Sequence, residues 1–407
     1  MLSMKAIETG IYMNRQSWQD ALTPEGTRSV FGHFNQSGWQ TIGTGKLFHG
    51  RTNDLRADDW TGYWDPPAEL INFNYEPLAA SAGGNFNFGP MVEGSTVDVL
   101  CTDWSVTQIR SGRFADGGTL MGLGLFRPHL PHIVAPEWFD LYPEQVNLPP
   151  GYWPGAQDIW GNAPDIADLP PLALETLDIR LTDRITRNGD LDAYLRSYYA
   201  STSFADAQIG RLLDAMEEQN LWDNTYLVVT SDHGFQLGEK QDIKKFELRE
   251  ISLRVPLFVA GPGIEARTVS DPVSLIDIYP TLCGLAGIEV PEHCSGIDLS
   301  GMLRTGNSIL PRRSHVESWY PGKGANRNDL KLHMSVRTPQ WRLIDYGHGQ
   351  WTLYNHDPNS FEYDPHEWYN KAGDRPEIVR QLQALLPAMD ELAPLQRFRR
   401  GNDDDDD

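Results

Sequence analysis

Residues 204–234, FADAQIGRLLDAMEEQNLWDNTYLVVTSDHG, contain a helix pattern that leads directly into a strand pattern. Apolar side chains recur at helical spacing, at Ile209, Leu212 and Met216, which predicts an amphipathic helix with one buried face. The β-branched run that follows predicts a buried strand, which ends at an Asp-His-Gly turn. A helix that feeds a buried strand is typical of an α/β fold, in which helices cover a parallel sheet.

Two further strand patterns support this fold class. Residues 120–126 form an apolar run that Pro128 and Pro131 stop, and residues 254–264 form another that a Gly-Pro-Gly turn closes. Strands and helices in alternation predict a largely parallel sheet flanked by helices, and we expect this α/β domain to span residues 1–310.

From about residue 311 the pattern changes. Short aromatic-rich segments separated by turn residues predict a small antiparallel sheet, and residues 375–393 predict a helix that Pro387 bends. We therefore expect a C-terminal subdomain, an antiparallel sheet plus a helix, over residues 311–395. The acidic run within residues 396–407 is typical of a solvated, disordered tail.

The composition limits the classes of partner. The formal net charge of −22 argues against nucleic acid, because phosphate backbones are bound by a surplus of Lys and Arg. No apolar run reaches the roughly 20 residues that a membrane-spanning helix needs. Three cysteines without metal-ligand spacing are best explained as small apolar side chains: Cys101, Cys283 and Cys294. The sequence is silent on the oligomeric state.

The N-terminal residues lack the basic and then apolar pattern of a secretory signal. If Met1 is the true start, we expect the protein in the cytoplasm. If a signal segment precedes Met1, we expect it in the periplasm or outside the cell. The sequence leaves both compartments open.

Three stretches rich in histidine, lysine and carboxylate follow the ends of predicted strands, at residues 45–50, 126–132 and 231–234. Because ligands of α/β sheets bind beyond the carboxyl ends of the strands, we expect these stretches to meet at one rim of the sheet. For each charged residue taken alone, a structural role is the better explanation. A shared role in one binding site becomes the better explanation only when these residues are considered together.

The last of these stretches has the chemistry of a metal site. Asp232 offers oxygen ligands and His233 a neutral nitrogen, and Gly234 permits the turn that lets both face one ion. The competing explanation is that Asp232 caps a loop and that His233 is simply hydrogen-bonded.

Two other features favour an anion as the ligand. The segment LGEKQDIKKF contains three of the eight lysines of the chain, at Lys240, Lys244 and Lys245. It is either a solvated loop or a mobile basic segment that closes over an anion, with one lysine as the clamp. His129 lies between two prolines that fix its backbone, so a directed role for its side chain is plausible.

Taken in order, these motifs resemble the sulfatase family of the alkaline-phosphatase-like superfamily. GKLFHG, RPHLP, the helix–strand stretch that ends in SDHGFQLGEK, and RVPLFVAGPG carry the resemblance, which covers about residues 7–395. The spacing Gly-Lys-x-Phe-His is similar to that of the iduronate-2-sulfatase-like branch. The resemblance implies an alkaline-phosphatase-like fold and hydrolysis of a sulfuric ester, on a sulfated sugar or a similar small molecule.

The resemblance also implies roles for individual residues. Asp232 and His233 match two ligands of a divalent ion, normally Ca²⁺, and Arg127 matches a position beside the substrate. Four positions match the residues that hold the sulfate or move protons: Lys46, His49, His129 and Lys245. In this family a cysteine converted to formylglycine attacks sulfur, while the cation and lysines hold the sulfate oxygens and histidines transfer protons.

Two elements of the family pattern are missing from the sequence: an Asp-Asp pair that completes the cation shell, and the sequon Cys-x-Pro-Ser-Arg. The segment AIETG at residues 6–10 matches the residues that close the sequon. This register places Ser3 on the sequon serine and the nucleophilic cysteine one residue before Met1. Leu2 and Met4 then replace the sequon proline and arginine.

Three explanations stay open: a fragment or wrongly started gene product, a degenerate non-catalytic relative, or a separate upstream polypeptide that supplies the missing strand. Two ligands alone are expected to bind Ca²⁺ weakly, because the ion usually takes 6–8 oxygens. Two other functions are also compatible with the motifs. One is a phosphonate or phosphate ester hydrolase of the same superfamily, and the other is a non-catalytic binder of sulfated glycans.

Overall fold

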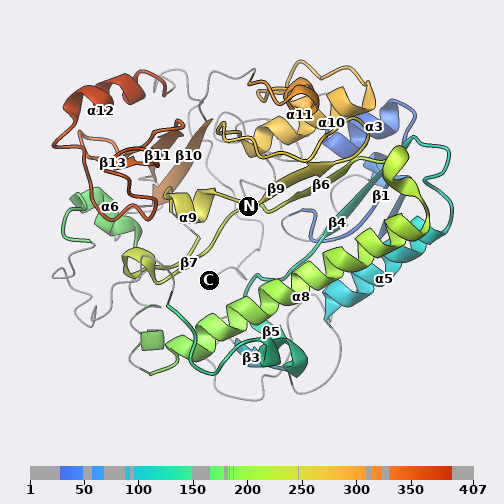
Figure 1. Ribbon diagram of the computed structural model, residues 1–407, viewed down its shortest axis with the longest axis horizontal. Coiled ribbons are helices and arrows are strands. Elements are labelled where there is room, and N and C mark those ends of the chain that lie inside the picture. Colours follow the sequence, from blue (N-terminus) through green and yellow to red (C-terminus); the bar gives the residue numbers. More distant parts are fainter. Residues whose placement is uncertain are drawn as a thin grey trace.

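The computed structural model describes these residues: 28–48, 57–67, 88–91, 96–148, 166–177, 182, 184–186, 188–245, 247–308, 314–321 and 330–386. A long helix runs diagonally below the central strands, and a second sheet lies at one end of the molecule (Figure 1). His49, the bend expected at Pro387 and the acidic tail lie outside the described residues.

The central sheet is parallel, in the order β2-β1-β4. Strand β1 (Gln40–Gly45) lies between β2 (Gly62–Trp64) and β4 (Thr119–Gly124). Its register with β4 runs from Gln40 opposite Thr119 to Gly45 opposite Gly124, so that both strands end at the same level. The predicted strand over residues 120–126 is confirmed, and its last two residues belong to the segment that follows it.

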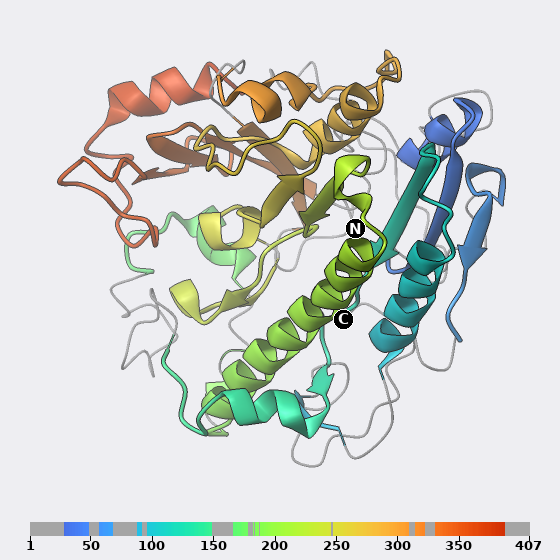
Figure 2. The ribbon, with the colours of Figure 1, turned by 45° about the vertical axis from the view of Figure 1, so that its right-hand side comes forward.

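Helices α5 (Val97–Arg110) and α8 (Leu191–Glu218) cover one face of this sheet. They lie side by side in both views of the molecule (Figures 1 and 2) and pack on Ile42 and Met121. The amphipathic helix predicted within residues 204–222 is therefore confirmed. It begins further upstream than its pattern indicated, and this earlier part is also buried, through Tyr194 and its neighbours.

Helices α3 (Val30–Gln36) and α10 (Ile278–Ala286) pack against the opposite face, where Leu120 joins their apolar cluster. Leu120 and Met121 are neighbours on β4 but belong to clusters on opposite faces, because successive side chains of a strand alternate. The predicted fold class, a parallel sheet between layers of helices, is confirmed.

Strands β6 (Leu227–Thr230) and β9 (Leu257–Ala260) form a separate antiparallel pair among the described residues. Thr230, at the end of β6, lies opposite Leu257, at the start of β9. The segment 231–256 therefore leaves the sheet and returns to it at the same place. The sequence pattern did not indicate this antiparallel pairing.

Strands β10–β13 form an antiparallel sheet in sequential order, which confirms the predicted C-terminal sheet. One face packs on α12 (Pro376–Gln383) through Val379 and Leu382, and the other packs on Leu248 and on α6 (Pro171–Thr176). The strand bounds are Ser314–Pro321, Leu330–Arg337, Trp341–Asp345 and Trp351–Asn355. The domain boundary near residue 311 stays a prediction.

Short elements connect these layers. The remaining strands are the parallel pair β3 (Phe88–Pro90) and β5 (His132–Val134) and the antiparallel pair β7 (Gln236–Leu237) and β8 (Ile243–Lys244). The remaining helices are α9 (Glu250–Leu253), α11 (Ser300–Thr305), η3 (Ala57–Asp59), η5 (Pro136–Leu141), η6 (Leu221–Asp223), η7 (Glu239–Gln241) and η8 (Leu275–Asp277). Every described helix is too short or too polar to span a lipid bilayer.

The central strand gives the first testable prediction. Ile42 is fully buried in β1, so Ile42→Ala should lower the free energy of unfolding by about 2–5 kcal/mol, through lost burial and the cavity left behind. Phe258→Ala is the control, because Phe258 is 66% exposed on β9, and it should cost less than about 1 kcal/mol. Urea unfolding followed by circular dichroism measures both values. Equal costs would contradict the layered core.

Candidate active site

Glycines bring the ends of β1 and β4 into direct contact. Lys46 N donates to Gly124 O over 2.7 Å, and Gly45 has a positive φ of 79°. A Cβ atom at Gly45 would lie 2.0 Å from Gly124 O, and one at Gly124 would lie 2.1 Å from the carbonyl carbon of Lys46. Side chains are therefore excluded at both glycines. Lys46 follows this junction, and its ammonium group lies 5.9 Å from the centre of the Phe126 ring.

The segment after β4 carries His129 to the same rim. His129 N donates to Phe126 O over 2.8 Å and closes a turn. The His129 ring has two partners: Nδ1 lies 2.6 Å from Leu130 O, and Nε2 lies 3.0 Å from Lys245 Nζ. A carbonyl oxygen only accepts, so Nδ1 carries the proton and Nε2 accepts from the lysine. The contact joins two segments that are 116 residues apart in the sequence.

The electrostatic setting keeps His129 neutral. Burial, Lys46 and Lys245 together lower the pKa of His129 to about 2, with burial as the largest cause. Lys46 and Lys245 therefore place positive charge beside a neutral imidazole, an arrangement that suits a bound anion. Lys46, His129 and Lys245 are each only partly buried, so a ligand from solvent can reach them.

Asp232 and His233 follow β6 at the rim, as predicted. His233 Nδ1 lies 2.9 Å from Gly234 O and donates to it, which directs the lone pair of Nε2 toward Asp232. The distance from His233 Nε2 to Asp232 Oδ2 is 3.5 Å. Burial lowers the pKa of His233 to about 4 although Asp232 opposes this, so the ring stays neutral at pH 7.

Two neighbouring donors with free lone pairs suit a divalent cation, so these residues fit part of a metal shell. Gly234 was expected to permit a turn, but the structure gives a different reason for a glycine at this position. Gly234 is outside the positive-φ region but packs on the backbone of α9, where a Cβ would lie 2.0 Å from Ile251 O.

A second acidic cluster, Glu250, His356 and Glu367, also brings three candidate metal ligands together. Its carboxylates already pair with arginines. Glu250 Oε2 lies 3.1 Å from Arg337 Nε and also contacts Arg342, whose Nε lies 3.0 Å from Glu367. Burial alone would raise the pKa of Glu250, but the two arginines outweigh it and lower the pKa to about 2. The cluster is therefore a salt-bridge network that ties the C-terminal sheet to α9.

The basic segment 237–246 does not act as one unit. Lys245 reaches His129, whereas Lys240 is 1% exposed and donates from Nζ to Trp368 O over 2.8 Å, with Asp168 Oδ1 at 3.5 Å. The interpretation of this segment as a single mobile cover over an anion is therefore wrong for Lys240, which anchors the segment to the C-terminal subdomain. The side chain of Lys244 lies outside the described residues.

Arg127 lies beside the site but is 3% exposed, and its Nε donates to Ile133 O over 3.0 Å. Its role as a substrate contact stays a prediction. Sequence analysis missed Asp98, a buried carboxylate that binds the backbone of Phe126 and Arg127. Only its place in the first turn of a helix was visible in the sequence, and that place is common for aspartate.

The cysteines are not candidate nucleophiles. Burial raises the pKa of each of the three thiols to about 12, so all remain protonated at pH 7. This agrees with their interpretation as small apolar side chains. All three are free of disulfide bonds.

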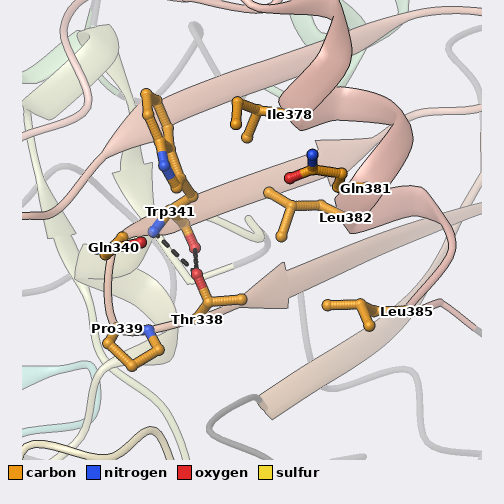
Figure 3. Close-up of a pocket in the computed structure, with 8 residues that line it drawn as sticks. All are labelled: Thr338, Pro339, Gln340, Trp341, Ile378, Gln381, Leu382 and Leu385. Atoms are coloured by element: carbon orange, nitrogen blue, oxygen red, sulfur yellow. Dashed lines mark hydrogen bonds between the residues drawn. The ribbon is translucent and has the colours of Figure 1, made fainter.

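A separate pocket of about 510 Å³ lies on the C-terminal subdomain, between the β11–β12 turn and α12 (Figure 3). Thr338 and Trp341 close the turn, with Trp341 N donating to Thr338 Oγ1 over 3.0 Å. Trp341, Ile378 and Leu382 form part of the pocket wall. None of the predicted site residues lines this pocket, so it has no part in the site described above.

Comparisons with known proteins agree with the motifs. The family described as Sulfatase matches residues 1–288, and the family described as N-sulphoglucosamine sulphohydrolase, C-terminal, matches residues 238–391. A protein named Sulfatase from Formosa agariphila is 28% identical over 373 residues, which cover 87% of this chain and 68% of the relative. Iduronate 2-sulfatase of Homo sapiens is 26% identical over 404 residues, with 80% and 70% covered.

Solved structures share the fold. A phosphonate monoester hydrolase of Agrobacterium radiobacter is 17% identical with a TM-score of 0.71, and 94% of this chain and 84% of that one are covered. A protein solved with its substrate D-glucosamine-2-N,6-O-disulfate is 21% identical with a TM-score of 0.67, and 95% and 86% are covered. At these identities the likeness concerns the fold.

The ionisation of His129 is the second testable prediction. Its ¹⁵N imidazole signals should show a neutral ring with the proton on Nδ1, without titration between pH 5 and 9. Lys245→Gln removes a nearby positive charge and should raise the pKa of His129, which burial still keeps below the usual value of about 6.5. Lys371→Gln serves as the control, because Lys371 pairs with Asp374 away from the site, and it should leave the pKa of His129 unchanged. A wild-type His129 that titrates near pH 6.5 would refute this electrostatic description.

Proposed function

The chain belongs to the sulfatase family, and we propose that it acts on sulfuric esters of sugars or of similar small molecules. Family homologues are sulfuric ester hydrolases, and iduronate 2-sulfatase is among the relatives. The neighbour solved with a sulfated glucosamine supports a sulfated sugar as the substrate class. The observation that carries the proposal is the convergence of Lys46, His129 and Lys245 at the rim of the sheet.

The proposed substrate is an anion, which suits the two lysines of this site. A sulfate ester carries one negative charge spread over three oxygens, and the ammonium groups of Lys46 and Lys245 would hold those oxygens. Ammonium groups in a partly buried site stabilise an anion more than they would in water, because less solvent competes. The overall net charge of −22 makes such a local concentration of cations necessary for anion binding.

His129 has a role in proton transfer in this proposal. Hydrolysis breaks the bond between sulfur and the ester oxygen, adds the oxygen of water to sulfur, and returns a proton to the leaving oxygen. A bound sulfate would take over the hydrogen bonds of Lys245 and release His129 Nε2 toward the leaving oxygen. The negative charge of the substrate would also raise the pKa of His129, which allows it to carry the proton.

Asp232 and His233 are proposed to hold part of the shell of a divalent cation, which we propose to be Ca²⁺. Members of the family generally depend on a metal ion. When bound, the cation would neutralise charge on the sulfate oxygens. The proposed attacking group is a formylglycine hydrate. The 407 residues contain no Cys-x-Pro-Ser-Arg sequon, so catalysis requires a nucleophile that these residues do not supply.

Two alternatives each have a supporting observation. The phosphonate monoester hydrolase shares the fold, which supports an ester of phosphorus as an alternative substrate because its anionic oxygens are similar. Leu2 and Met4, which stand where the family sequon has proline and arginine, support a non-catalytic binder of sulfated glycans. Turnover of a sulfate ester identifies a sulfatase, and turnover of a phosphonate ester identifies a phosphonate hydrolase. Binding of a sulfated glycan without turnover identifies a binder.

Binding of glucosamine 6-sulfate, measured by titration calorimetry, tests the anion site. Lys46→Ala and Lys245→Ala should each weaken binding about 10- to 100-fold, because a charge-assisted hydrogen bond contributes about 1.5–3 kcal/mol. Lys371→Ala is the matched control, since this lysine pairs with Asp374 on the surface. Equal affinities of wild type and both site variants would exclude the proposed site. Parallel assays of sulfate and phosphonate ester hydrolysis identify the reaction.

Calcium titration tests the metal ligands. Asp232→Asn and His233→Gln should each weaken Ca²⁺ binding at least about tenfold, since even changes in the outer shell of a metal site cost 10- to 100-fold. Glu250→Gln, in the salt-bridge network, should leave Ca²⁺ affinity unchanged. If only Glu250→Gln lost Ca²⁺ binding, the metal site would instead be the cluster of Glu250, His356 and Glu367.

A further inference from the structure

Asp98 is a buried carboxylate next to the candidate active site. It lies in the first turn of α5, and its side chain is fully buried. Its two oxygens accept hydrogen bonds from consecutive backbone amides: Oδ1 from Phe126 N over 2.6 Å, and Oδ2 from Arg127 N over 3.1 Å. A single carboxylate thus clamps the chain at the point where it leaves β4.

The clamped segment presents two parts of the site. Phe126 O accepts the hydrogen bond from His129 N, so the turn that orients the imidazole begins at a clamped residue. The Phe126 ring lies under the ammonium group of Lys46, 5.9 Å away. A shift of the backbone at Phe126 would therefore move both the imidazole and the ring that faces Lys46.

The clamp uses both carboxyl oxygens as acceptors. Both amides are donors, so both oxygens of Asp98 must accept, which an asparagine cannot do equally well. Burial is the largest influence and raises the pKa of Asp98, although Arg127, the two amide hydrogen bonds and Lys46 act in the opposite direction.

We propose that Asp98 is a positioning residue of the anion site: its carboxylate clamps the backbone of Phe126 and Arg127 and thereby sets the orientation of His129 toward Lys245. This inference rests on the proposed function, because it assigns Asp98 a role in the same site. It acts on the site through the segment 126–129, whose backbone it holds.

The experiment compares Asp98→Asn with a matched control, Asp277→Asn. Asp277 is also buried, and its two oxygens also accept from two backbone amides, Ser274 N over 2.7 Å and Ile297 N over 2.9 Å. Both variants lose one acceptor of such a clamp, but Asp277 lies on the other side of the sheet, at α10. Both should therefore be destabilised, and only Asp98→Asn should alter the anion site.

Two readouts separate positioning from stability. The ¹⁵N imidazole signals of His129, assigned with His129→Gln, should shift or broaden in Asp98→Asn and stay unchanged in Asp277→Asn. Affinity for inorganic sulfate should fall between about tenfold and 100-fold in Asp98→Asn only, because small displacements at a site are costly. His129 signals that are identical in wild type and a folded Asp98→Asn would overturn the proposal.

A third measurement needs no variant, in case Asp98→Asn does not fold. Hydrogen exchange in the wild-type chain should protect the amides of Phe126 and Arg127 as strongly as those of β4. Rapid exchange of both amides would contradict the clamp. If the wild type binds no sulfate, the proposed function loses its support, while the His129 signals and the amide protection still decide whether Asp98 positions this segment.

Discussion

The contact of Lys245 Nζ with His129 Nε2, over 3.0 Å, joins the two halves of the candidate site. One partner follows a central strand of the parallel sheet, and the other lies in the segment 231–256 that leaves and rejoins the sheet at one place. Because β6 and β9 are antiparallel, the two ends of that segment lie at the same end of the pair. The contact with His129 then holds Lys245 beside the segment that follows β4.

The close approach of β1 and β4 sets the geometry on the other side. Gly45 lies against the backbone of Gly124, and Gly124 lies against the backbone of Lys46, so that a side chain at either glycine would clash. This close approach places Lys46 beside the segment of Phe126. Further support comes from outside the sheet. Lys240 and the network of Glu250 with Arg342 anchor both ends of the Lys245 segment to the C-terminal subdomain. The C-terminal subdomain thus restrains the lysine that reaches the imidazole.

Charge explains why the site is suited to an anion. The chain is strongly acidic overall, yet Lys46 and Lys245 lie near one imidazole and help to lower its pKa to about 2. An anion bound beside these lysines would be stabilised by both charges, which is the electrostatic basis of the proposed sulfate site.

Much of the fold and part of the site followed from the sequence alone. Periodicity identified the helix α8, the strands β4, β6 and β9, and the C-terminal sheet, because local patterns of apolar residues report which face is buried. The ends of strands then indicated Lys46, His129, Asp232 and His233 as rim residues, since ligands of such sheets bind there. The family resemblance singled out Lys245, whereas the tertiary structure showed that Lys240 is buried against Trp368, and only the structure revealed Asp98. Which lysine points inward, and which carboxylate meets two distant amides, depends on contacts between segments far apart in the chain, and local patterns carry no information about them.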